Sequence, residues 1–401
     1  MIADTISAER KSASVQVNAV FSVRSGLSRA QGSALKVQSV VADAAMQSES
    51  HGMLCAASSE YPMSDIQKIN GICIGVGVRG KSWCQWAQDA GMNVVGVVDI
   101  NETLLNEVCD ELEVPKAMRF TSIADAASRT DATVATVCTS NSTHVACLNQ
   151  CMDAGLHAMV EKPMAETPGE ARTLLAKSHE TGCRVAVAQN YRYGPGIIAM
   201  RNVIRDGLIG DVFTIHARFA RWRPAPGFTL PLLLNQAIHH LDSVRFLLDC
   251  DWSWCFATSR IADWSPTDGP SLLSAIWRFE DGHPIDFSYD GTYVTRGQQT
   301  PFSGQWWIEG TKGRIEFTGD LHTSAPELSL IDDEMTRPID IVDPGVGEPA
   351  LAFRDFLAGL RTGEPAPTEI DDNVKSLGMC WAAQLSSDEQ RVVQAHEVEI
   401  A

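Results

Sequence analysis

Between residues 69 and 188 the chain alternates short, almost wholly apolar runs with stretches of helical periodicity. Runs of this length and composition are typical of strands that are buried on both faces. They are INGICI from Ile69, NVVGVVD from Asn93, DATVATVCTS from Asp131, HAMVEK from His157 and RVAVAQ from Arg184. Because strands that alternate with helices form parallel sheets, residues 63–189 are expected to form a doubly wound α/β domain.

Beyond residue 189 the helices between the strands disappear from the pattern. A linker rich in turn formers, QNYRYGPG, leads into a helix that ends near Gly207. Later runs have the period of strands and are separated by turns: VFTIHARF, SLLSAIWRF, PIDFSYDGTYV, QWWIEG and GRIEFTG. Strands joined by turns predict a mostly antiparallel open sheet, so residues 190–401 are expected to form an α+β domain.

The first turn of the α/β domain reads GVGVRG, a Gly-x-Gly-x-x-Gly sequence. The first glycine permits a tight turn, the second lets the backbone approach a pyrophosphate, and the third lets helix and strand pack closely. The next strand ends at Asp99, near the spacing at which a carboxylate receives a ribose diol. A Rossmann dinucleotide-binding domain is therefore predicted, with these residues at the cofactor: Gly75, Gly77, Val78, Arg79, Gly80, Asp99 and Ile100. NAD is favoured over NADP, because Asp99 would repel a 2′-phosphate and Ile100 offers no cation.

Polar residues follow two later strands of the same domain. The run HAMV ends in Glu161, Lys162 and Pro163, and the strand before it ends in the loop TSNSTH. Ligands of doubly wound sheets bind beyond the carboxyl ends of the strands. Further cofactor contacts are therefore expected near the nicotinamide, from Ser140, Asn141, His144, Glu161 and Lys162. The alternative is that the charged pair merely terminates a buried strand.

One helix interrupts the strands of the second domain and reads PLLLNQAIHHLDSVRFLLD from Pro231. At 100° per residue its leucines form one apolar face, whereas Asn235, His239 and Asp242 group on the opposite side. His240 lies at the edge of the apolar face and is predicted to be a packed histidine. For His239 the periodicity fits solvent exposure and a functional role equally well.

Composition narrows the class of protein. Of the 401 residues, 44% are hydrophobic and 20% charged, and no apolar run approaches the roughly 18 residues of a membrane span. The net charge of −18 argues against a nucleic-acid surface. Eleven cysteines at irregular spacing fit the reduced thiols of a cytoplasmic enzyme, so neither a metal site nor a disulfide framework is expected.

The first 62 residues differ from the rest of the chain. From Arg10 to Ala42 there is no acidic residue, and basic residues alternate with serine and alanine. This composition resembles an organelle transit peptide, and it is also what a mis-assigned start codon produces, because MSDIQKINGICIGVG from Met63 reads like a natural beginning. We expect an extension that is dispensable for folding and catalysis, and a cytoplasmic location unless the extension is a transit peptide.

Four features, in this order, resemble the Gfo/Idh/MocA oxidoreductase family: the glycine loop, the strand-end Glu-Lys-Pro, NYRYGP from Asn190 and NQAIHHLD from Asn235. The resemblance implies a Rossmann domain followed by an open-faced antiparallel sheet, through which a homodimer or homotetramer would assemble. It also implies hydride transfer between a nicotinamide cofactor and a hydroxyl carbon of a sugar, cyclitol or sugar derivative.

The resemblance also assigns roles to individual residues. Lys162 matches the family's active-site lysine, in a Lys-Pro bond that is often cis in relatives, and His239 matches its catalytic histidine. Arg192 and Tyr193 match positions near the cofactor and substrate. Asn235 departs from the aspartate that many members carry, and an asparagine can bond a substrate hydroxyl but cannot take its proton.

Removal of a hydroxyl proton must accompany the departure of hydride. His239 titrates in the useful range and is the expected base, with Lys162 orienting and polarising the substrate oxygen, although the two roles could be exchanged.

Two other functions fit the same fold and remain alternatives to a dehydrogenase. One is glycoside cleavage or epimerisation by transient oxidation, and the other is a non-catalytic sugar or dinucleotide sensor. The substrate is open: the arginines of RFARWRPAPGF could hold a carboxylate or phosphate, or could lie in a solvated turn.

Overall fold

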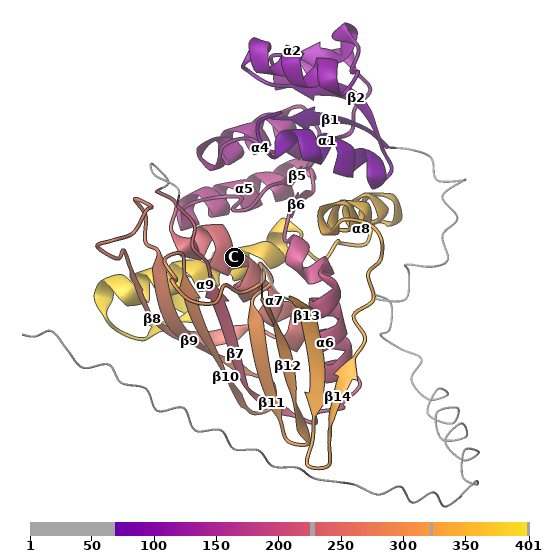
Figure 1. The fold of residues 1–401 in the computed structure, drawn as a ribbon. Helices are drawn as coiled ribbons and strands as arrows, with labels where there is room; N and C mark the ends of the chain where they lie inside the picture. Colours follow the sequence, from indigo (N-terminus) through magenta and orange to yellow (C-terminus); the bar gives the residue numbers. More distant parts are fainter. Residues whose placement is uncertain (1–68, 225–228, 321–323, 399–401) are drawn as a thin grey trace, which may run out of the picture. The chain divides into compact units, whose positions relative to one another are not determined.

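The computed structural model describes residues 69–224, 229–320 and 324–398. The predicted extension, residues 1–62, lies outside these ranges. Within them the chain builds a six-stranded parallel sheet and then a nine-stranded sheet (Figure 1). The predicted order of the two sheet types is confirmed.

The first sheet has the strand order β3-β2-β1-β4-β5-β6, and every neighbouring pair is parallel. Its strands are β1 (Ile69–Ile74), β2 (Met92–Val98), β3 (Arg119–Phe120), β4 (Val134–Val137), β5 (His157–Val160) and β6 (Val185–Val187). The order turns back on itself between β1 and β4, which places the ends of β1, β4 and β5 side by side, where ligands of such sheets bind.

Helices connect these strands. They are α1 (Gly80–Asp89), α2 (Glu102–Glu111), α3 (Ile123–Arg129), α4 (His144–Asp153) and α5 (Pro168–Thr181). Asn101 caps α2 by accepting a bond from the backbone N–H of Leu104. Thr167 and Glu170 form a capping box before α5, which satisfies backbone donors that a helix start leaves unpaired.

The second sheet has the order β14-β13-β12-β11-β7-β10-β9-β8-β15. Its strands are β7 (Val212–Ala220), β8 (Trp252–Arg260), β9 (Leu272–Glu280), β10 (Pro284–Thr292), β11 (Gln305–Gly310), β12 (Gly313–Asp320), β13 (Ser324–Ile331), β14 (Thr336–Ile339) and β15 (Val393–Gln394). All pairs are antiparallel except β7 with β10. Alternating buried and exposed positions along β9 show that the helices cover one face.

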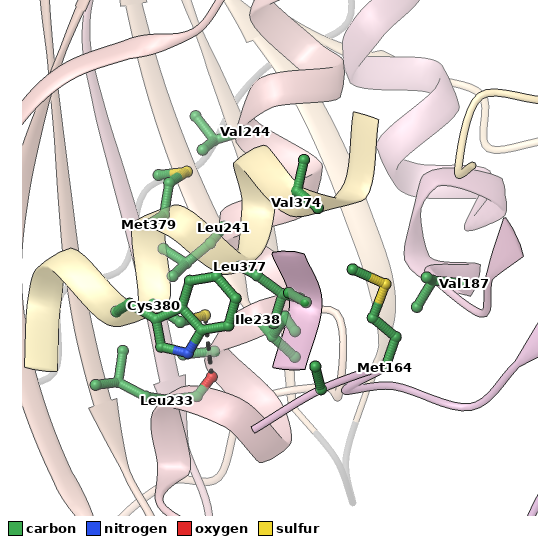
Figure 2. Close-up of a cluster of buried hydrophobic side chains, with 14 of the residues drawn as sticks. Met164, Val187, Leu233, Ile238, Leu241, Val244, Val374, Leu377, Met379 and Cys380 are labelled. Carbon is green, nitrogen blue, oxygen red and sulfur yellow. Dashed lines mark hydrogen bonds between the residues drawn. The ribbon is translucent and has the colours of Figure 1, made fainter. Parts of the chain in front are cut away.

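A buried apolar cluster joins the histidine helix to the last long helix. Helix α7 (Ile238–Leu248) packs against α9 (Ile370–Glu389), and α6 (Pro195–Arg205) packs against α7. In Figure 2, Ile238 and Leu241 lie with Leu377 of α9, and Met164 and Val187 come from the parallel-sheet part of the chain. One core therefore extends under both sheets and fixes the histidine helix against the end of β5.

The chain also returns to the first sheet near its end. Helix α8 (Glu348–Thr362) packs against α1, and Phe353 lies with its ring centroid 6.5 Å from that of Trp83. After α8, the backbone carbonyl of Thr368 accepts a bond from the N–H of Val187 at the end of β6. The predicted 190–401 unit thus contributes a helix to the surroundings of the 63–189 unit.

No helix in the three described ranges is long and apolar enough to cross a membrane.

Candidate active site

The glycine loop after β1 fits a bound dinucleotide. Gly75 has φ +87°, and a Cβ on it would lie 2.3 Å from the carbonyl oxygen of Cys138. A Cβ on Gly80 would lie 2.1 Å from the carbonyl oxygen of Gly75. The fold itself therefore requires these two glycines. A Cβ on Gly77 would meet nothing within 4 Å, so the bare backbone there faces open space that a pyrophosphate can approach.

Asp99 lies beside this loop at the end of β2. Its carboxylate oxygens accept bonds from the backbone N–H groups of Val76, at 2.9 Å, and Asn101, at 2.9 Å. Each oxygen keeps a lone pair for a further donor, as a ribose diol would supply. The side chains of Val78 and Ile100 are almost fully exposed, and no basic residue stands at either position. The surroundings of Asp99 therefore also fit the predicted cofactor.

Lys162 follows β5, and its peptide bond to Pro163 is cis, as the family resemblance implies. Its ammonium group donates to the backbone carbonyl of Asn235 and to the Asn235 side-chain Oδ1, at 3.1 Å for the latter. Burial lowers the pKa of Lys162 from 10.5 to about 8, Glu161 opposes this shift, and the charges of Arg79 and Arg223 add to it. Lys162 is thus held between the two sheets with an unusually acidic ammonium group.

Glu161 bonds two backbone and side-chain donors near the end of β5. One carboxylate oxygen accepts a bond from the indole Nε1 of Trp83 in α1, at 2.8 Å. The other oxygen accepts from the backbone N–H of Lys162 at 3.3 Å. The side chain therefore fixes the strand end to the helix that follows the glycine loop, which connects the two parts of the predicted cofactor site.

Asn235 lies in a single π-helical turn, η4 (Leu233–Ala237), that opens the histidine helix. Its amide Nδ2 donates to the hydroxyl of Tyr293 at 2.7 Å while its Oδ1 accepts from Lys162. Turns of this kind widen a helix by one residue and are frequent at functional sites. Here the turn leaves the backbone carbonyl of Asn235 in reach of the lysine.

His239 is buried, with 6% of its surface exposed, although the helical pattern placed it opposite the apolar face. Its ring stacks on Tyr191, with centroids 4.2 Å apart and planes 14° apart. Burial, together with the positive charge of Lys162, holds its pKa well below the usual 6.5. Its Nδ1 atom has no hydrogen-bond partner within the described part of the chain. His239 is therefore a buried, neutral imidazole beside Lys162, with one ring nitrogen that no described residue bonds.

Two other histidines are structural. His240 is fully buried, donates from Nε2 to the carbonyl of Phe302 at 3.1 Å and accepts from the hydroxyl of Tyr289 at 3.1 Å, which confirms the prediction of a packed histidine. Burial lowers the pKa of His240 to about 4. His144, predicted to lie near the nicotinamide, is fully buried and donates from Nδ1 to the carbonyl of Pro163 at 2.8 Å. It connects the start of α4 to the strand end that carries Lys162.

The remaining predicted site residues divide between the loop after β4 and a buried ion network. Ser140 and Asn141 lie at the surface beside α4, in the loop that was expected to flank the nicotinamide. Arg192, by contrast, is buried and forms ion pairs with Asp242 and Asp372. Its remaining donor nitrogen bonds the backbone carbonyl of Pro367 at 2.7 Å.

Two tyrosines at the site, Tyr191 and Tyr293, were not predicted from the sequence. Tyr191 stacks on His239 and accepts a bond from the Gln236 amide at 2.7 Å, and Tyr293 accepts from Asn235. The family motif NYRYGP contains Tyr191, but the resemblance drew attention to Tyr193, whose ring instead packs in the apolar cluster beside α8. For Tyr293 no local signal exists, because it follows an ordinary strand.

Comparison with known proteins decides the family. Residues 69–189 match the model described as the oxidoreductase family, NAD-binding Rossmann fold, and residues 197–316 match the GFO/IDH/MocA C-terminal domain. The chain belongs to the Gfo/Idh/MocA oxidoreductase family. The two matched stretches contain both the glycine loop and the histidine helix.

Similar members of the Gfo/Idh/MocA family include sugar and cyclitol dehydrogenases. The D-apiose dehydrogenase of Paraburkholderia graminis is 23% identical over 354 residues, which cover 83% of this chain and 92% of the relative. The inositol 2-dehydrogenase of Gluconacetobacter diazotrophicus is 27% identical over 183 residues, 45% of this chain and 54% of that protein. An oxidoreductase from Agrobacterium radiobacter, solved with NAD+, L-tartaric acid and magnesium, shares the fold with a TM-score of 0.75 at 19% identity, covering 83% of this chain and all of that one.

Among the described residues of this Gfo/Idh/MocA chain, no group of three or more His, Cys, Asp or Glu side chains is arranged to hold a metal ion. The polar groups at the end of β5 include the amine of Lys162, the amide of Asn235 and the imidazole of His239. These are groups that orient an alcohol and exchange a proton with it.

Proposed function

We propose that this Gfo/Idh/MocA oxidoreductase is an NAD-dependent dehydrogenase that acts on a hydroxyl carbon of a sugar, cyclitol or sugar derivative. The observation that carries the proposal is the contact of Lys162 with Asn235, one helical turn before His239, at the strand end where a dinucleotide would place its reactive ring. Bound NAD would accept the hydride; the protein must hold the alcohol and take its proton.

The donors of Lys162 support a role as the proton acceptor. A lysine ammonium has three N–H donors, and two of them bond the carbonyl and the Oδ1 of Asn235. A neutral amine keeps two donors for these same acceptors and has a lone pair in the place of the third. The pKa near 8 brings the neutral form within reach of neutral pH, and a cationic nicotinamide nearby would lower the pKa further.

His239 then serves as the partner that orients the hydroxyl. Its depressed pKa keeps the imidazole neutral, but it also makes the ring a weak base. Asn235 supplies no carboxylate that would raise the pKa. The pKa shifts therefore support Lys162 as the base and His239 as the residue that orients the hydroxyl, which is the reverse of the assignment made from the sequence.

The pH dependence tests this division of roles. In the wild-type enzyme, kcat/KM for alcohol oxidation should rise with pH, with a midpoint at or below about 8, because only neutral Lys162 accepts the proton. Asn235→Asp should move this rising limb to higher pH, since a carboxylate beside Lys162 and His239 favours their charged forms. A wild-type limb with its midpoint below pH 6.5 would return the role of base to His239.

Asp99 supports NAD over NADP as the cofactor. Asp99→Asn keeps the shape of the side chain but removes its charge, so we expect the KM for NAD to rise roughly tenfold or more, the scale of one charge-assisted hydrogen bond, while use of NADP improves. Initial rates with each cofactor, with the melting temperature as a control on folding, measure both changes. A wild-type enzyme that binds NADP more tightly would refute the preference.

The reaction class is tested by following cofactor absorbance with a panel of polyols, sugar acids and sugar nucleotides. Formation of NADH in proportion to product is expected. Product formation with unchanged NAD would instead indicate glycoside cleavage or epimerisation through transient oxidation. Absence of any turnover with tight sugar or NAD binding would indicate a sensor.

The exposed face of the second sheet supports the proposed homo-oligomer. On this face a shallow hollow is lined by His216, Phe256, Ile276 and Trp307, and the side chains of Phe256 and Ile276 are 42% exposed each. Such apolar surface at the centre of a sheet is typical of an interface. A second copy of the chain, placed by a two-fold axis, would cover it.

A further inference from the structure

The proposed site carries an excess of positive charge. The charges that act on Lys162 come from Arg79, Arg223 and one carboxylate, Glu161. That carboxylate is bonded to the indole of Trp83, and Asn235 is neutral. Arg79 precedes α1 in the glycine loop, where a cofactor pyrophosphate would face it. Among the residues that the structure describes, no carboxylate forms an ion pair with Arg223.

The side chain of Arg223 lies at the edge of the site rather than in a separate turn. Its backbone N–H donates to the carbonyl of Tyr293 at 3.0 Å, and its guanidinium carbon lies 5.6 Å from the centroid of the Tyr293 ring. Tyr293 in turn accepts from Asn235, which accepts from Lys162. A continuous row of contacts therefore runs from the amine of Lys162 to this guanidinium.

The neighbouring arginines are engaged differently. Arg221 is buried, donates to the carbonyl of Thr300 at 2.9 Å and lies 3.8 Å from the centroid of the Phe302 ring. Arg296 is exposed, and its guanidinium carbon lies 4.2 Å from the centroid of the Trp222 ring. Arg223 is exposed and forms no ion pair with any residue that the structure describes.

We propose that the substrate of this enzyme carries an anionic group, a carboxylate or a phosphate, and that Arg223 binds it. The inference rests on the proposed dehydrogenase function and deepens it by naming the substrate class. Because one phenol and one amide separate the guanidinium from Lys162, the anionic group would lie a few bonds from the hydroxyl carbon that is oxidised. A planar guanidinium binds either anion with two parallel bonds. The substrate is then a sugar acid or a sugar phosphate.

Matched substrates test the inference on the full chain with NAD. Glucose is compared with gluconate, glucuronate and glucose 6-phosphate, and galactose with galacturonate, by NADH formation and by the rise in melting temperature of the NAD-loaded protein. We expect an acid or a phosphate to be preferred over its neutral counterpart. Arg223→Gln should lower kcat/KM for that anion roughly ten- to a hundredfold, mainly through KM, the scale of a lost charge-assisted pair. The two anion types in the panel distinguish carboxylate from phosphate.

Controls separate this role from a solvated arginine. Arg223→Lys should keep part of the affinity, and Arg296→Gln, an exposed arginine of the same region, should leave the kinetics unchanged. Added salt should raise the KM for the anion in the wild-type enzyme but not in Arg223→Gln. Equal losses for neutral and anionic substrates in Arg223→Gln, a preference for neutral substrates, or no stabilisation by any anion would each overturn the inference. A different outcome separates the two proposals. If anions raise the melting temperature of the wild type but not of Arg223→Gln, and no NADH forms, the anion-binding role of Arg223 is upheld and the proposed dehydrogenase function is refuted.

Discussion

Replacing Lys162 by alanine is expected to lower turnover by roughly a hundredfold or more, the scale on which enzymes lose a proton-transfer or polarising group. The affinity for NAD should change little, because the glycine loop and Asp99 lie on other strand ends. His239→Ala should act similarly. The double variant should lose less than the product of the two factors, since both side chains serve one proton. Turnover and cofactor titration measure these quantities separately.

A second lysine of the same domain provides the control. Lys177 is part-buried and pairs with Asp153 at 2.6 Å, where the two residues lie near the C-terminal ends of α5 and α4. Because the proposed site lies at the carboxyl ends of the strands, Lys177→Ala should keep full turnover. If Lys162→Ala retained near-normal turnover while melting at a much lower temperature, Lys162 would be a strand terminator, the simpler of the two interpretations of the sequence.

Replacing Arg192 by methionine should produce the largest loss of stability. Its guanidinium bonds both carboxylate oxygens of Asp242, at 2.6 and 2.7 Å, and also contacts Asp372 and the carbonyl of Pro367. Loss of one partner leaves a buried carboxylate uncompensated, which costs about 3–5 kcal/mol of unfolding free energy. Calorimetry should show a fall in melting temperature of roughly 5–15 °C. Arg278→Met provides the control, because its pair with Asp286 is partly exposed and is expected to contribute at most about 1 kcal/mol.

The same network predicts how stability depends on pH. Burial alone would raise the pKa of Asp372, but the charges of Arg192 and Arg245 outweigh burial and hold the pKa below its usual value. The contribution of Asp372 to stability is therefore present above the unfolded-state pKa and is lost as the pH falls through the lower folded-state value. Arg192→Met should flatten this acid limb. An unchanged limb, or a loss of stability no larger than that of Arg278→Met, would contradict the assigned role of the network.

Sequence patterns that involve only neighbouring residues predict much of the fold. The glycine spacing and the apolar runs each constrain a few neighbouring residues, and the structure has the glycine loop and the strands where the sequence predicts them. The histidine helix was found by its period. The sequence did not predict that its first turn is π-helical, because LLNQA is equally compatible with an α-helical turn.

Long-range contacts explain what the sequence did not reveal. The side of the helix that carries His239 and Asp242 is polar, and its period fits solvent exposure and a functional role equally well. In the structure this side packs against the linker after β6, where Tyr191 stacks on the imidazole and Arg192 neutralises the carboxylate. A polar residue that is buried by a partner about 50 positions away has no signature in its own helix.

Helix α8 has a consequence for how the protein is made. A ribosome releases the glycine loop and all six strands of the parallel sheet long before it reaches Phe353 and Phe356, whose side chains complete the apolar cluster around Trp83. Until then, the nascent cofactor domain exposes that surface of α1 to solvent and to chaperones. A chain truncated before residue 348 would keep every predicted NAD contact in its sequence and would lack the helix that covers this surface of α1.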